Sequence, residues 1–187
     1  VEAVKSKKIK FVTKRFEKVF YHWMQNIKDW NISRQIVWGI PIPIWYCSKC
    51  GKEIVYIEEG NPQKCPSCGN TTFEKEKDVF DTWFSSGQWP YATLGYPDSD
   101  DFKNFYPTSV METGWDILFF WVARMIMFGL YTTGQPPFEY VYLHGLIRDK
   151  DRQKMSKSKN NVIDPLGMID FYGSDALRMS LIVGNAP

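Results

Sequence analysis

Apolar positions recur along the chain at two spacings, which together predict an α/β protein. Residues 14–30 and 115–131 place apolar side chains three or four positions apart, as is typical of helices with one buried face. In the first segment these side chains are Phe16, Val19, Phe20, Trp23, Ile27 and Trp30. Short apolar runs at 9–12, 108–112 and 140–144 predict strands.

The second half of the chain predicts a βαβ unit. A strand at 108–112, a helix at 115–131 and a strand at 140–144 give two parallel strands joined by a right-handed crossover. The strand ends, at 112–114 and 144–146, then lie at the same edge of the sheet. Because ligands of open α/β sheets bind at that edge, we expect a ligand site there.

Helix starts are predicted from capping residues. Thr13 precedes the first helix, and Asp164 is followed by Pro165 at a first helical position. Ser174 precedes another apolar helical segment at 175–183.

Length and composition limit the classes of protein. A chain of 187 residues has room for one domain and a small accessory module. Its 44% hydrophobic and 24% charged residues exclude disordered and coiled-coil classes. The net charge of +2 gives no global basic field, so any nucleic-acid binding has to be local. The 17% aromatic content indicates a pocket or a covered neighbouring surface.

No segment predicts a membrane partner. The most apolar stretch, 117–131, is shorter than the roughly 20 residues that span a bilayer, and it contains Arg124. The lysine-rich residues 1–10 are not followed by the apolar region of a signal peptide. We therefore expect a cytoplasmic protein. Because the chain lacks an initial Met and stops at 185–187 after an apolar segment, we expect a piece of a larger protein.

All the cysteines form one pattern that predicts a metal site. They are arranged as two CxxC pairs, each followed by glycine: Cys47, Cys50, Cys65 and Cys68. Two such turns facing each other form a closed tetrahedral site, which favours structural Zn²⁺, with iron as the main competitor. Disulfides and free buried thiols are the alternatives, and disulfides are disfavoured in a cytosolic chain.

A basic loop follows the predicted ligand edge. Residues 148–159 contain six Lys or Arg and two Asp with no apolar periodicity, so we expect a solvated, mobile loop. Ammonium groups on such a loop suit a phosphate chain that gains charge in a transition state. A basic loop with no ligand is the simpler alternative.

The sequence of this loop resembles a known signature. KMSKS, at 154–158, is similar to the second signature of class I aminoacyl-tRNA synthetases, and its flanks resemble the valyl, isoleucyl and leucyl branch. Asn160 departs from the glycine that is common there. Other segments resemble the valyl-tRNA synthetases, in particular NISRQIVWGIPIPIWYC, DVFDTWFSSGQWP and PTSVMETGWDILFFWVARMIM.

The resemblance implies the C-terminal half of a Rossmann-type parallel sheet with an inserted zinc ribbon. Residues 1–46 and 73–187 would be the second half of the catalytic domain, and 47–72 the inserted module. The HIGH signature, the editing domain and the anticodon-binding domain have no counterpart in the sequence. The chain alone is therefore expected to be inactive or weakly active.

The resemblance also implies a reaction and a set of partners. Valine and ATP, with Mg²⁺, would give valyl-adenylate and pyrophosphate, and the valyl group would pass to tRNA(Val). Lys154 and Lys157 would be catalytic and stabilise the departing pyrophosphate, whereas Lys159 would be solvated. Met155 and Ser156 would complete the ATP-binding part of the loop.

Further ATP contacts are implied at the strand ends. Gly114 would let the ribose approach the backbone, Asp116 would accept hydrogen bonds from its hydroxyls, and His144 with Gly145 would face the adenine. The alternative is that residues 113–116 form a helix-starting box in which Asp116 only caps amides.

The implied valine contacts precede the βαβ unit. Asp78 would face the ammonium group of valine, with Asp81 a less favoured candidate. Trp45 and Trp83 would wall the side chain, although Trp38 competes with Trp45 for that position. Two other readings of the chain stay open: a fragment of an isoleucyl-tRNA synthetase, and a non-catalytic zinc-ribbon module that binds tRNA or another partner.

Overall fold

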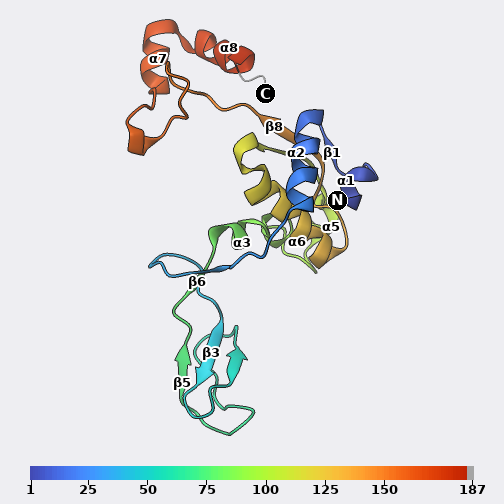
Figure 1. Ribbon diagram of the computed structural model, residues 1–187, viewed down its shortest axis with the longest axis vertical. Coiled ribbons are helices and arrows are strands. Elements are labelled where there is room, and N and C mark those ends of the chain that lie inside the picture. The colour runs from blue at the N-terminus through green and yellow to red at the C-terminus, as the bar shows by residue number, and fades with distance from the viewer. Residues whose placement is uncertain (185–187) are drawn as a thin grey trace. The chain divides into compact units, whose positions relative to one another are not determined.

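The computed structural model of the chain describes residues 1–184, and the chain divides into two compact units (Figure 1). One unit comprises Val1–Ile27 and the chain from Gly87 onward, and the other comprises Lys28–Ser86. The second unit is wider than the expected module at 47–72, because the segments that flank the cysteines pair with each other. The expectation about residues 185–187 lies outside the described part of the chain.

A parallel sheet organises the first unit. Its strands are β1 (Lys10–Phe11), β8 (Phe138–His144) and β7 (Thr108–Gly114), in that order across the sheet. Both neighbouring pairs are parallel, and the pairing of β7 with β8 confirms the one that the βαβ order predicts. Gly114 pairs with His144, so the two long strands end side by side at one edge.

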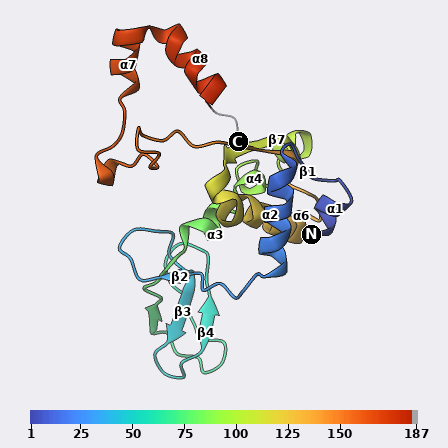
Figure 2. The ribbon, with the colours of Figure 1, turned by 45° about the horizontal axis from the view of Figure 1, so that its top comes forward.

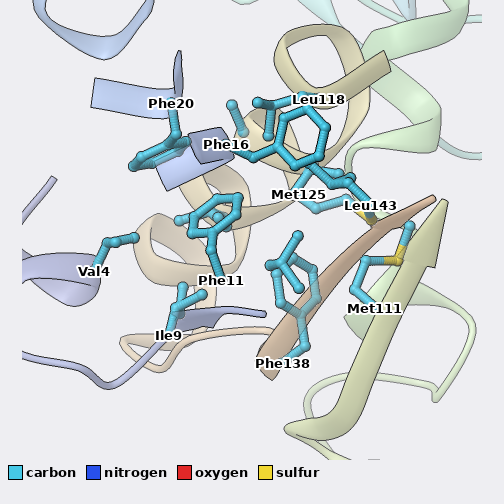
Figure 3. Close-up of a cluster of buried hydrophobic side chains, with 14 of the residues drawn as sticks. Val4, Ile9, Phe11, Phe16, Phe20, Met111, Leu118, Met125, Phe138 and Leu143 are labelled. Atoms are coloured by element: carbon cyan, nitrogen blue, oxygen red, sulfur yellow. The ribbon is translucent and has the colours of Figure 1, made fainter. Parts of the chain in front are cut away.

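Two helical segments pack with this sheet to form the core. They are α2 (Lys14–Gln25) and a helical run of three parts: a 3₁₀ turn η1 (Trp115–Ile117), a π-helical turn η2 (Leu118–Ala123) and α6 (Arg124–Thr133). Figure 3 shows Phe16 and Phe20 of α2 gathered with Leu118, Met125 and sheet residues such as Phe138 and Leu143. Each such side chain contributes roughly 1.5–3 kcal/mol when fully buried, so this cluster holds α2 and the helical run against the sheet.

Helix α2 ends earlier than the apolar spacing predicts. Asn26 closes it, because its backbone and side-chain amides both donate to the carbonyl of His22. Trp30, the last residue of the predicted stripe, belongs to the second unit and packs on Phe84. The side chain of Thr13 makes no capping hydrogen bond, so the predicted cap is present by position only.

The helical run Trp115–Thr133 is longer than the sequence predicted. It has 19 residues with a mean hydropathy of 1.3, and by length and composition alone it could cross a membrane. Val122, Met125 and Ile126 of this run are at most 2% exposed and lie in the core cluster. Buried core helices can have the same length and hydropathy, so these two properties are weak evidence for a membrane span.

Further helical segments complete the first unit. They are α1 (Glu2–Lys5), α4 (Trp89–Ala92), α5 (Asp100–Phe105), the 3₁₀ turn η3 (Lys157–Lys159), α7 (Pro165–Tyr172) and α8 (Ser174–Gly184), and α7 and α8 pack on each other (Figure 2). The predicted cap of α7 is confirmed: Asp164 accepts hydrogen bonds from the amides of Leu166 and Gly167, each at 3.2 Å.

The second unit contains two antiparallel sheets and one short helix. Its elements are β3 (Ile44–Cys47) between β4 (Glu53–Val55) and β5 (Phe73–Lys75), β2 (Ser33–Arg34) paired with β6 (Val79–Phe80), and α3 (Thr82–Ser86). The two turns that carry the CxxC pairs lie at one end of the three-stranded sheet, and their geometry is described below.

A buried carboxylate joins the parts of this unit. Asp81, 6% exposed, pairs with Arg34 and accepts hydrogen bonds from the indole of Trp30 at 3.0 Å and the amide of Trp83 at 2.9 Å. Its oxygens are thus occupied by groups that hold β2, β6 and α3 together, which makes Asp81 a structural residue here.

Candidate functional site

The ends of β7 and β8 meet around a glycine that no other residue can replace without a shift. A Cβ added to Gly114 would lie 2.8 Å from Oδ1 of Asp116 and 3.1 Å from Leu146. His144 lies directly across, with its ring carbon 3.8 Å from the same point. The backbone at Gly114 is therefore closely approached by the side chains predicted to surround a nucleotide.

The basic loop reaches this strand edge. Nζ of Lys154 donates a 2.6 Å hydrogen bond to Oδ2 of Asp116. The sequence prediction depended on the loop and the strand ends lying close together, and these two side chains are in direct contact. The helical run begins directly after Gly114 with Asp116 in its first turn, as the helix-starting alternative predicts, but no side-chain capping hydrogen bond is seen at η1.

Glu112 is a site residue that sequence reasoning missed. Its carboxylate lies 3.2 Å from Nε2 of His144, and Nδ1 of His144 lies 2.6 Å from the carbonyl oxygen of Gly145. Both ring nitrogens are thus engaged, which fixes the orientation of the imidazole. The signal was available: Glu112 is two residues before Gly114, and alternate residues share one face of a strand.

The lysine loop is solvated, as expected, and it also contains internal hydrogen bonds. Side-chain and backbone bonds centred on Asp149 tie its two arms together. The amide of Asn161 and the backbone amides of Gln153 and Asp151 hold the pKa of Asp149 below its ordinary value. Met155 and Ser156 are half-buried, and Lys157 lies exposed in η3.

These groups form a mixed-charge cluster suited to a phosphorylated ligand with hydroxyl groups. A carboxylate at Asp116 can accept hydrogen bonds from hydroxyls, and ammonium groups at Lys154 and Lys157 can bind phosphate. The pair between Lys154 and Asp116 is exposed, at 61% and 25% of the two side chains. Exposed ion pairs contribute only about 0.2–1 kcal/mol, so a ligand can separate this one.

The residues predicted to bind valine all lie in the second unit. Asp78 precedes β6 and accepts a 2.6 Å hydrogen bond from the side chain of Gln35. Trp45 lies on β3, the central strand of the cysteine-bearing sheet, with Nζ of Lys75 5.7 Å from its ring centre. Trp83 lies in α3, and Trp38 is 90% exposed. Their roles stay predictions.

The cysteines come together as the spacing predicted. Their sulfur atoms all lie within 4.8 Å of one another, with Cys47 to Cys68 at 3.6 Å and Cys50 to Cys65 at 3.7 Å. A tetrahedral zinc site with 2.3 Å bonds has sulfur–sulfur edges of about 3.8 Å. The two turns match: Gly51 and Gly69 both have left-handed backbone, at φ of +68° and +74°, and donate to the carbonyls of Cys47 and Cys65.

Hydrogen bonds to sulfur favour the thiolate at two of the cysteines, Cys47 and Cys65. Burial alone raises the pKa of Cys47, but the backbone amides of Cys50 and Lys49 and the side chain of Asn70 outweigh it and lower the pKa to about 6. Cys65 is lowered in the same way by the amides of Cys68 and Ser67. At Cys50 the backbone amide of Lys52 lowers the pKa, but the contact with the Cys68 sulfur and burial outweigh it and raise the pKa to about 12. Metal ligation requires thiolates, which Cys47 and Cys65 favour, and the arrangement of the four sulfur atoms fits a structural zinc ion.

Comparison with known proteins places these features in a family. The family description "tRNA synthetases class I (I, L, M and V)" matches residues 1–187. The chain is 55% identical over its full length to the valine–tRNA ligase of Clostridium acetobutylicum, and 56% identical to that of Dehalococcoides mccartyi strain ATCC BAA-2266. It spans 21% of the length of each relative. The expectation that the chain is the second half of a catalytic domain stays a prediction.

Solved structures share the fold. A ternary complex of Agrobacterium radiobacter K84 agnB2 LeuRS with tRNA and LeuAMS matches 94% of this chain and 29% of that chain, with a TM-score of 0.65 and 26% identity. Methionyl-tRNA synthetase of Mycobacterium tuberculosis bound by methionyl-adenylate matches 97% of this chain and 30% of that chain, with a TM-score of 0.62. At 21% identity, the second match bears on the fold alone.

Proposed function

The chain belongs to the class I tRNA synthetases for isoleucine, leucine, methionine and valine, and from this premise we propose that it is part of a valine–tRNA ligase. The complete enzyme would join valine to ATP as valyl-adenylate and pass the valyl group to tRNA(Val). The identity of about 55% to valine–tRNA ligases supports valine over the other amino acids of the family. A cytoplasmic location remains a prediction.

The observation that carries the proposal is the contact of Lys154 with Asp116 beside Gly114 and His144. We assign Asp116 to the ribose hydroxyls, because a carboxylate is the acceptor such donors need and its Oδ1 lies beside the backbone of Gly114. His144 and Gly145 would lie against the adenine. ATP binding would separate Lys154 from Asp116 and direct its ammonium to the phosphates.

The lysines of the loop would then act on the leaving group. When the valine carboxylate attacks the α-phosphorus of ATP, the bond to the bridging oxygen breaks and pyrophosphate leaves with the added charge. Lys154 and Lys157 would stabilise that charge, with Met155 and Ser156 holding the backbone between them. Ammonium groups aimed at developing charge lower the barrier rather than only strengthening binding.

The second unit would supply the amino-acid contacts and the metal. Asp78 would pair with the ammonium group of valine, and Trp45 and Trp83 would enclose its side chain. Cys47, Cys50, Cys65 and Cys68 would hold a zinc ion, which gives the small sheet the stability that its few buried residues cannot.

Amino-acid-dependent exchange of pyrophosphate into ATP tests the proposal. The full-length ligase that carries this stretch is expected to exchange fastest with valine, and more slowly with isoleucine, leucine and methionine. Faster exchange with isoleucine would instead support an isoleucyl enzyme. Absence of exchange with every amino acid, in protein that binds tRNA, would overturn the proposal in favour of a non-catalytic binding module.

A further inference from the structure

Asp149 and Asn161 hold the two arms of the lysine loop together. Oδ1 of Asp149 accepts hydrogen bonds from the backbone amides of Gln153 at 2.7 Å and Asp151 at 3.0 Å. Its other oxygen, Oδ2, accepts a 2.6 Å bond from the side-chain amide of Asn161. One carboxylate therefore fixes the turn before the lysines and also the residue that follows them.

Asn161 also binds the backbone of the lysine segment on both sides of Met155. Its Oδ1 accepts a 2.8 Å bond from the amide of Ser156, and its Nδ2 lies 3.3 Å from the carbonyl oxygen of Lys154. A side-chain amide is one of the few groups that can both donate and accept in this way. The path of the backbone at Lys154 is thus set by a residue seven positions later.

The turn between them brings Asn161 back to the loop. Asn160 has left-handed backbone, with φ of +52°, directly after η3. Asparagine tolerates this conformation better than most residues, as does glycine. This accounts for the residue at which the chain departs from the glycine common in related loops.

We propose that Asn161, together with Asp149, is a positioning residue that sets the lysine loop so that the ammonium of Lys154 reaches the strand-end site. The proposal rests on the proposed function for its effect on catalysis, but the order of the loop does not depend on that function. Asn161 itself would touch neither ATP nor valine. Its effect on the reaction would pass through the backbone of Lys154 and Ser156.

Substitutions at two adjacent asparagines test this role. Asn161→Ala removes the bridge, and Asn161→Asp keeps its shape but replaces the donor with a second carboxylate facing Asp149. Asn160→Gly is the matched control, because glycine accepts the same backbone angle. In the full-length ligase that carries this stretch, we expect the amide of Ser156 to exchange with solvent at least about tenfold faster in both Asn161 variants, and at the normal rate in Asn160→Gly.

The effect on catalysis separates positioning from a general structural role. In the full-length ligase, Asn161→Ala is expected to lower kcat of valine-dependent exchange about 10- to 100-fold with KM for valine unchanged, since misplacement by about 1 Å can cost 10²-fold. In a Lys154→Ala background, Asn161→Ala should add little, because both changes remove the same interaction.

Three results would overturn the proposal. The first is normal protection of the Ser156 amide in Asn161→Ala. The second is a double variant, Lys154→Ala with Asn161→Ala, whose kcat falls by the product of the two single losses. The third is an equal rise in amide exchange throughout β8, which would indicate general unfolding. If the unmodified ligase showed no valine-dependent exchange, the proposed function would fail, while the exchange rate of the Ser156 amide would still decide whether Asn161 orders the loop.

Discussion

Lys157→Ala in the full-length ligase is expected to slow valyl-adenylate formation by about 10²- to 10³-fold, with a much smaller change in KM for valine. The size follows from the cost of removing one donor that stabilises transition-state charge. Lys157 lies exposed at the start of η3, in the lysine loop that contacts the strand-end site through Lys154. Single-turnover formation of the adenylate is the appropriate measurement, because it isolates the chemical step.

Lys159→Ala is the matched control for this experiment. Both lysines lie in η3 and carry the same charge, but Lys159 is assigned to solvent. We expect its removal to change the rate no more than about threefold. Equal losses for the two variants would mean that the loop acts only through its general positive charge, and would contradict the role given to Lys157.

Cys65→Ser is expected to release the metal and to unfold the cysteine-bearing sheet. Structural zinc contributes roughly 10–16 kcal/mol to the folding of small peptides of this kind, and this sheet has few buried residues of its own. Metal content should fall, and amides of β3, β4 and β5 should exchange rapidly. Amides of β7 and β8, in the other unit, should keep their protection.

The control for the metal site lies in the same turn. Ser67→Ala leaves the cysteines and the backbone amide of residue 67 in place, so the metal and the protection of the sheet should be retained. Well-folded unmodified protein that contains neither zinc nor iron would contradict the assignment. Metal retained at full content by Cys65→Ser would contradict it as well.

Much of the first unit could be predicted because its elements follow local rules. The parallel pairing of β7 and β8 follows from the strand, helix and strand order, and the start of α7 follows from Asp164 and Pro165. The end of α2 could not be predicted, because Trp30 fits the helical spacing but is held by Asp81, 51 residues away. The spacing of apolar residues shows which face of a helix is apolar, but it does not show which segment of the chain packs against that face.

One part of the candidate site could be predicted, namely that the ends of β7 and β8 lie together at one edge of the sheet. The contact of Lys154 with Asp116 follows from that topology and from the loop that leaves β8. The internal hydrogen bonds of the loop were missed, because Asp149 and Asn161 bond to each other across 12 positions. Glu112 was missed because a charged residue on a strand is usually a solvated one.

Titration of the 187-residue chain with Mg²⁺-ATP, followed by amide chemical shifts, tests most directly whether the strand ends and the lysine loop form one nucleotide site. We expect the amides of Gly114, His144 and Lys154 to shift together with a single dissociation constant, and the amide of Gly51, in the first CxxC turn, to stay unchanged. In Gly114→Ala, whose added Cβ would collide with Asp116, the shifts should be lost or need at least about tenfold more nucleotide. Saturable shifts confined to the lysine loop, unchanged by Gly114→Ala, would show that the strand ends are not part of the nucleotide site.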